Sequence, residues 1–253
     1  NAALPTLTPN RVPQIILIYW VIKIASTTLG ETGADMFSMT FNMGYAVTIL
    51  IFMALFLLLL GFKLALRRYQ PALYWLVFTA TAIVGTAISD FIDRTLGLGY
   101  LAGSLLLLGL LFLILFVWKR SEKTIAVEDI RTTKAEAFYW TAFLIANTLG
   151  TAAGDWVADD LGIGFLHSAM IIAVILIALI GLHYFTKVSG VVLFWLAFVL
   201  TRPFGATFGD LLTKSHEQGG LDLGTVGASL FFAVMRESQL EKRRVRETTA
   251  SQG

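Results

Sequence analysis

The sequence predicts an all-α integral membrane protein with eight transmembrane helices, built as four two-helix repeats. Hydrophobic residues make up 57% of the 253-residue chain and charged residues 14%, whereas soluble domains carry about 25% charged residues. The mean hydropathy is +0.75. A glycine followed five residues later by an aspartate occurs at Gly30, Gly85, Gly150 and Gly205, with spacings of 55, 65 and 55 residues. The first half therefore maps onto the second by a shift of 120 residues, which indicates a duplicated duplication.

Eight mostly apolar stretches have about the 20 residues that a helix needs to cross a membrane, and polar or glycine-rich breaks separate them. The predicted spans are residues 13–35, 44–66, 71–90, 99–118, 136–155, 164–186, 189–210 and 223–235. Residues 1–120 form a first half with repeats 1 and 2, residues 121–134 a cytoplasmic linker, and residues 135–253 a second half with a basic C-terminal tail. Each half crosses an even number of times, so the two four-helix halves are parallel repeats.

Lysine and arginine residues collect after the even-numbered spans, and this sets the expected orientation. They are Lys63, Arg67 and Arg68 after the second span, Lys119, Arg120, Lys123, Arg131 and Lys134 after the fourth, Lys187 after the sixth, and Arg236, Lys242, Arg243, Arg244 and Arg246 after the eighth. The other connections carry little beyond Arg94 and Lys214. Because basic loops stay in the cytoplasm, we expect both termini there.

Each odd-numbered span begins with an aromatic pair in the same register. The pairs are Tyr19-Trp20, Tyr74-Trp75, Tyr139-Trp140 and Phe194-Trp195. Amphipathic rings favour the membrane boundary, so we expect these pairs to anchor the cytoplasmic ends rather than to bind a ligand. The motif aspartate follows 15 residues after each tryptophan, about 22 Å along the helix axis. It therefore approaches the opposite side of the membrane.

A small residue lies four positions after each motif glycine, on the same helix face. These residues are Ala34, Ser89, Gly154 and Gly209. Small pairs let helix backbones approach closely in a membrane, where lipid supplies no hydrophobic drive for association. We expect the four odd-numbered spans to pack against one another near their aspartate-bearing ends.

The repeated carboxylates form the candidate site, because charged residues inside membrane spans are costly and usually functional. The candidate metal ligands are Glu31, Asp35, Asp90, Asp155 and Asp210. Oxygen ligands without cysteine and almost without histidine suit magnesium, calcium or manganese. Clustered carboxylates repel one another, so protons and a metal ion would compete for them. The alternative remains that the acids at the helix ends face water, or that they repeat only through common ancestry.

Two cations, Lys23 and Arg202, lie inside apolar stretches and need partners. Lys23 precedes Glu31 by eight residues and Arg202 precedes Asp210 by eight, about 12 Å by helix rise, so pairing across helices is expected. The candidate substrate or coupling residues are Lys23, Thr27, Thr28, Asn147, Thr148 and Arg202. Whether the two cations neutralise an empty site or tie helices together is open from the sequence.

Several function classes are disfavoured. The chain has no cysteine, which removes disulfides and thiolate metal sites. The HExxH, GxSxG and Walker patterns do not occur in it, so we expect no enzyme, no cofactor and no direct use of ATP. The basic residues flank the spans instead of covering one helix face, so the expected partners are a lipid bilayer and a small ion or solute, and not nucleic acid.

Three segments resemble a known family. They are residues 23–31 (KIASTTLGE), 147–155 (NTLGTAAGD) and 200–210 (LTRPFGATFGD). They look like a family of bacterial membrane proteins made of four repeats of unknown function, and the resemblance covers nearly the whole chain. It implies a repeat architecture and a location in the bacterial inner membrane, but no reaction or substrate.

The residues themselves predict a membrane transporter or exporter of a divalent metal cation, with manganese as the first candidate and with coupling to protons. One alternative is an anion or small acidic-solute carrier that uses Lys23 and Arg202 as a clamp. Another is a non-transporting membrane scaffold whose tails bind partners.

Overall fold

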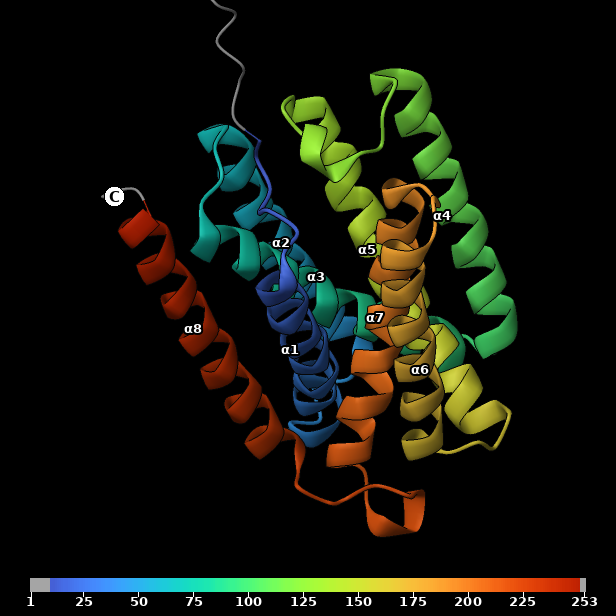
Figure 1. Ribbon diagram of the computed structural model, residues 1–253. Coiled ribbons are helices and arrows are strands. Elements are labelled where there is room, and N and C mark those ends of the chain that lie inside the picture. Colours follow the sequence, from blue (N-terminus) through green and yellow to red (C-terminus); the bar gives the residue numbers. More distant parts are fainter. Residues whose placement is uncertain (1–9, 251–253) are drawn as a thin grey trace, which may run out of the picture.

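Within residues 10–250, apolar stretches separated by polar or glycine-rich breaks fold into eight α-helices (Figure 1). The computed structural model describes residues 10–250, and the side chains of residues 10–241. The odd-numbered helices are α1 (Leu17–Asp35), α3 (Pro71–Asp90), α5 (Thr133–Asp155) and α7 (Gly190–Thr213). The even-numbered helices are α2 (Tyr45–Leu66), α4 (Tyr100–Glu122), α6 (Phe165–Phe185) and α8 (Thr225–Ala250). The basic side chains predicted at Lys242, Arg243, Arg244 and Arg246 lie outside the described part.

The eighth helix is longer than predicted, because it continues beyond the apolar residues 223–235 into a polar stretch. Three of the odd-numbered helices run from the motif aspartate directly into a π-helical segment, namely η1 (Met36–Thr40), η2 (Phe91–Thr95) and η4 (Trp156–Asp160). The following helices α2, α4 and α6 are each preceded by a glycine with positive φ, at Gly44, Gly99 and Gly164. This backbone conformation is open to glycine at no steric cost, so the glycine breaks set where the chain turns back.

The odd-numbered helices form a closed inner ring. Helix α1 packs on α3, α3 on α5, α5 on α7, and α7 back on α1. Each outer helix packs on the inner helix of the next repeat: α2 on α3, α4 on α5, α6 on α7, and α8 on α1, along which it returns in Figure 1. The four repeats therefore interlock, and α8 closes the circle.

The motif glycines make this ring tight. A Cβ atom on any of them would lie less than 3.0 Å from an atom of a residue in the next repeat. In each case this residue stands three positions before the motif glycine of that repeat. The pairs are Gly30 with Ala82, Gly85 with Asn147, Gly150 with Arg202, and Gly205 with Thr27. The contact recurs at all four interfaces, which confirms the predicted packing of small residues.

In the described part of the chain, five helices are long and apolar enough to cross a membrane, judged by length and composition: α2, α3 with η2, α4, α6 and α7. Of the most apolar 18-residue stretch of each helix, only 17%, 22% and 28% is buried in the outer helices α2, α4 and α6, whereas 78% is buried in α3. Helices that are apolar all round and yet exposed are suited to lipid. The chain thus has the character of a membrane protein.

Apart from the partly buried Trp20, the rings of the aromatic pairs are buried and do not anchor a lipid boundary, so that prediction was wrong for them. Tyr19, Tyr74, Trp75, Tyr139 and Trp140 are all fully buried. The hydroxyl oxygens of Tyr74 and Tyr139 lie 2.6 Å apart, and the rings of Tyr19 and Trp75 have centroids 5.6 Å apart. Because the inner ring turns this register inward, the pairs form an aromatic core where the odd-numbered helices begin.

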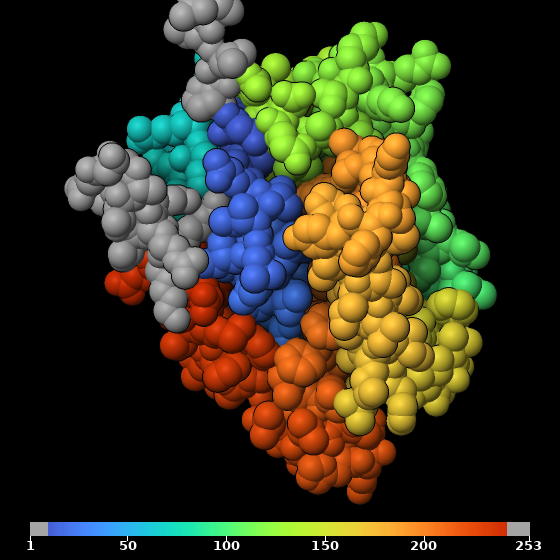
Figure 2. Space-filling model, in the orientation of Figure 1, coloured from blue at the N-terminus to red at the C-terminus, as the bar shows by residue number. Residues whose placement is uncertain are grey.

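The predicted linker, residues 121–134, packs across this aromatic end. Its side chains Val127 and Ile130 are buried. The Arg11 backbone N–H donates to the Ile130 carbonyl at 2.9 Å, and Trp195 Nε1 donates to the Ile125 carbonyl at 3.1 Å. Figure 2 shows this yellow-green region beside the blue start of the described chain. The linker therefore contributes a cap rather than a free loop.

A buried ion triad holds the cap in place. Glu136 Oε1 lies 2.5 Å from Lys63 Nζ, and Glu136 Oε2 lies 3.1 Å from Arg11 Nη1. The side chains of Glu136 and Lys63 are fully buried, and that of Arg11 is 8% exposed. The carboxylate joins the start of α5 to the end of α2 and to the segment before α1.

Gly85→Ala should destabilise the fold by about 1–3 kcal/mol, the usual cost of overpacking, because its Cβ would lie 2.9 Å from the Thr148 backbone nitrogen. Gly109→Ala is the control: nothing lies within 4 Å of that Cβ, and alanine favours a helix by up to about 1 kcal/mol. Thermal unfolding in detergent measures both. Equal midpoints would contradict the tight ring.

Glu136→Gln should cost about 3–5 kcal/mol, because it leaves two buried cations without their carboxylate. Asp129→Asn is the matched control, since Asp129 pairs with Arg131 in a largely exposed pair worth about 1 kcal/mol or less. Unfolding of the two variants under the same conditions compares them, and an equal loss would show that the triad is not holding the cap.

Candidate functional site

The inner ring carries stacked layers of side chains at matching positions of the four repeats. Seven residues before the motif glycines lie Lys23, Phe78, Phe143 and Phe198, and one residue after them lie Glu31, Thr86, Thr151 and Ala206. Five residues after them lie Asp35, Asp90, Asp155 and Asp210. Successive layers are thus separated by helical steps of roughly 6–12 Å.

Lys23 replaces a phenylalanine in an otherwise aromatic layer. Its Nζ lies 4.0 Å from the ring centroid of Phe198 and 5.8 Å from that of Phe78. It donates to the Phe198 carbonyl at 2.9 Å and contacts the Thr201 hydroxyl. The buried ammonium is thus held by ring faces and oxygen dipoles, two helical turns from Glu31.

Arg202 and Glu31 form an ion pair across α7 and α1, as the expectation of interhelical pairing required. Arg202 Nη1 lies 3.1 Å from Glu31 Oε2, and both side chains are at most 3% exposed. Arg202 Nη2 donates to the Thr151 hydroxyl at 2.7 Å and contacts the Thr86 hydroxyl. Those two hydroxyls donate to Glu31 Oε2 at 3.3 and 3.1 Å. One network thus joins all four repeats.

Lys214 and Arg94 bridge pairs of motif aspartates and so act as clamps. Neither residue was included in the candidate site predicted from the sequence. Lys214 Nζ lies 2.6 Å from Asp35 Oδ2 and 3.3 Å from Asp210 Oδ1. Arg94 lies 3.5 Å from Asp90 and 3.3 Å from Asp155. Each cation therefore bridges its own motif aspartate and that of a neighbouring repeat.

A signal for these clamps exists in the sequence. Arg94 and Lys214 each follow their motif aspartate by four residues, the spacing of neighbours on a helix surface. They are also 120 residues apart, which equals the shift between the two halves. Lys214 follows the last residue of α7. Burial by itself lowers the pKa of Lys214, but the Asp210 and Asp35 carboxylates raise it above the ordinary lysine value, so the clamp keeps its charge.

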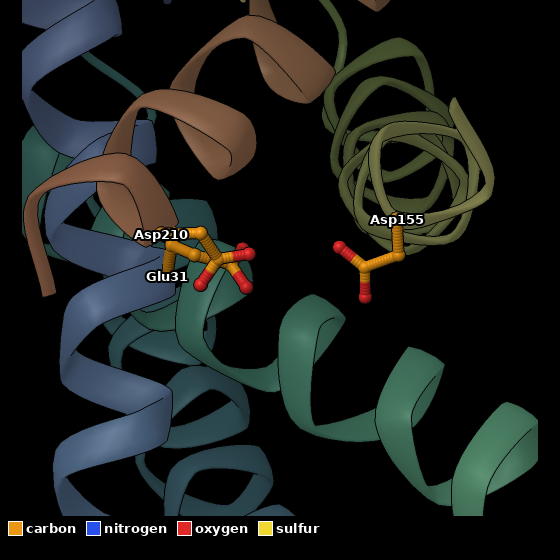
Figure 3. A group of neighbouring side chains, drawn as sticks. All are labelled: Glu31, Asp155 and Asp210. Carbon is orange, nitrogen blue, oxygen red and sulfur yellow. The ribbon is translucent and has the colours of Figure 1, made fainter. Parts of the chain in front are cut away.

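Three carboxylates converge in the interior: Glu31, Asp155 and Asp210 each offer an oxygen, and these oxygens lie within 4.8 Å of one another. The three residues are at most 2% exposed. In Figure 3 Asp155 faces Glu31 and Asp210 from the other side of the site. Asp155 Oδ1 is buried without a hydrogen-bond partner, whereas its Oδ2 accepts from Arg94. The group has the oxygen donors that hard divalent cations prefer.

The other predicted residues fall into different places. Asp35 and Asp90 lie in the clamps and not in the three-carboxylate group. Thr27 and Thr28 donate to the Ile24 carbonyl at 2.9 and 3.0 Å. The hydroxyl of Thr148 donates to the Leu144 carbonyl, and the amide of Asn147 donates to the Thr81 hydroxyl, each at 3.0 Å. These bonds serve helix packing rather than the carboxylates.

Fold and site define a helical protein of four interlocking repeats with a charged interior. The family model described as Repeat of Unknown Function (DUF347) matches residues 18–69, 73–124, 138–189 and 193–235. The chain therefore belongs to this family, as the repeated motif predicted, and each matched segment starts near the beginning of an inner helix. No curated protein and no solved structure shows a significant match.

Arg202→Met should destabilise the fold by about 3–5 kcal/mol, because Glu31 would keep a buried charge without its partner. The double variant Arg202→Met with Glu31→Leu removes both charges and should recover most of that loss. Unfolding midpoints of the single and double variants measure the coupling. Additive losses would show that the pair is not an interacting unit.

Proposed function

We propose that this protein is a multi-pass transporter of a divalent metal cation, with manganese as the first candidate. The observation that carries the proposal is the three-carboxylate group of Glu31, Asp155 and Asp210, buried at the centre of four repeats. We propose further that all eight helices span the bacterial inner membrane, with both termini in the cytoplasm.

The geometry of the group supports a cation of this class. Magnesium binds oxygen at about 2.0–2.1 Å and calcium at about 2.3–2.6 Å, so two ligands on opposite sides of such an ion are about 4–5 Å apart. The separation of up to 4.8 Å between the three carboxylate oxygens falls in this range. The hydroxyls of Thr86 and Thr151, both bonded to Glu31, supply further oxygens nearby.

The charge of the interior also favours a cation. Glu31 and the four motif aspartates are five buried carboxylates. Arg94, Arg202 and Lys214 pair with them, and Lys23 is a fourth buried base, two helical turns from Glu31. Five against four leaves one negative charge when all are ionised. An added cation, or a proton, offsets it. Proton and metal then compete for one site, which is the basis we propose for proton coupling.

The alternatives explain these contacts less well. An anion held by Arg202 would have to displace Glu31 from a 3.1 Å ion pair and compete with two hydroxyls. A scaffold needs no buried carboxylates, since apolar residues of similar volume often pack as well as a buried ion pair, or better. A transport site, in contrast, needs charged groups that exchange partners.

The double variant Asp155→Asn with Asp210→Asn tests the proposal. It removes two of the three ligands, so manganese flux into proteoliposomes should fall at least about tenfold, the loss expected when about 1.4 kcal/mol or more of binding is removed. Asp160→Asn, which changes an exposed acid at the end of η4, is the control and should keep native flux. Flux equal to native in the double variant, or native flux of an acidic solute without metal flux, would overturn the cation proposal.

A further inference from the structure

At one position of the repeat, the second and fourth repeats carry a basic residue and the first and third do not. The residues four positions after the motif aspartates are Met39, Arg94, Asp159 and Lys214. Arg94 joins the aspartates of α3 and α5, and Lys214 joins those of α7 and α1. Two of the four interfaces of the ring are therefore closed by a cation that the chain itself provides.

The interface between α5 and α7 has the opposite arrangement. Its aspartates are Asp155 and Asp210, and the matching position holds the exposed acid Asp159 instead of a base. Glu31 lies against the same two aspartates, and the Oδ1 atom of Asp155 is buried without a hydrogen-bond partner. This interface therefore gathers negative charge at the place where its neighbours hold a side-chain cation.

The interface between α1 and α3 is different again. Its matching position is Met39, an uncharged side chain. Its aspartates Asp35 and Asp90 are contacted by Lys214 and Arg94, just as Asp210 and Asp155 are, but Glu31 does not join them in a carboxylate group. Among the described residues, Glu31, Asp155 and Asp210 form the only group of three or more acidic, histidine or cysteine side chains that could hold a metal ion. The asymmetry singles out one place in the ring.

We propose that the transported cation occupies, between α5 and α7, the place that Arg94 and Lys214 occupy at the neighbouring interfaces. Of the four interfaces in the aspartate layer, tethered side chains fill two, Met39 leaves the α1–α3 interface without a charge at the matching position, and the α5–α7 interface is left for a small inorganic cation. Asp159 is the specificity-determining residue that leaves this place to an external ion. The inference rests on the proposed function and deepens it by placing the substrate.

Asp159→Lys tests the inference, because it supplies a tethered cation at the open interface. Isothermal titration of the purified full chain with manganese alone should show affinity reduced at least tenfold, and the unfolding midpoint without metal should rise. Asp160→Lys makes the same charge change one residue away and should bind manganese within about twofold of native, because a lysine there lacks the four-residue spacing that places Arg94 and Lys214 on their own aspartates.

The outcomes separate the inference from the function on which it rests. Native affinity in Asp159→Lys, together with lost binding in Asp155→Asn, would overturn the placement and leave the cation site standing. Failure of the native chain to bind manganese, or any other divalent ion of a panel, would overturn the proposed function itself.

A second variant keeps the test decisive if Asp159→Lys does not fold. Lys214→Met empties one of the two filled places and frees Asp35 and Asp210 from their clamp. It should raise the manganese stoichiometry from one to two ions per chain. A stoichiometry that stays at one would show that the places in the ring are not equivalent.

Discussion

The close approach of four helix backbones at the motif glycines is the constraint on which the rest of this structure depends. With no Cβ at Gly30, Gly85, Gly150 and Gly205, each inner helix lies directly against residues of the next. This contact puts the four repeats in register, so that side chains at matching positions meet in layers around one interior. Oppositely charged side chains on neighbouring helices then come close enough to form ion pairs. These pairs stabilise charges whose burial in an isolated apolar helix would cost too much free energy. The outer helices hold the ring by packing on neighbouring repeats.

Within this near-symmetric frame, the charged interior is built from departures from symmetry. Three phenylalanines and Lys23 share one layer, and Glu31 shares another with two threonines and an alanine. The pairing of Glu31 with Arg202 ties the first repeat to the fourth. In the aspartate layer, tethered cations close two interfaces and leave uneven charge at the others. A duplicated scaffold thus supplies equivalent positions, and single substitutions at those positions assign each one a distinct role.

The two ends of the ring have different chemistry. At the end where the odd-numbered helices begin, tyrosine and tryptophan rings fill the interior, and the linker covers them through the triad of Arg11, Lys63 and Glu136. At the other end lie the carboxylates, the clamps and the π-helical segments, an irregularity common near functional sites. In the conformation described here, a solute reaching the carboxylates from the aromatic end would have to pass several buried ring layers, whereas Arg94 remains 30% exposed at the aspartate end.

The sequence by itself determined the helical class, the four repeats, the inward-facing small residues and the set of acids from which the site is built. Periodicity and spacing carry this information because they specify axial position and helix face. Tertiary structure alone decided which helices are neighbours in the ring, and therefore that Arg202 meets Glu31. It also decided that Arg94 and Lys214 each reach a second aspartate, on the neighbouring repeat, and that most rings of the aromatic pairs face inward instead of toward lipid. These outcomes depend on rotation of each helix about its axis and on ring order, which arise only when all four repeats pack together.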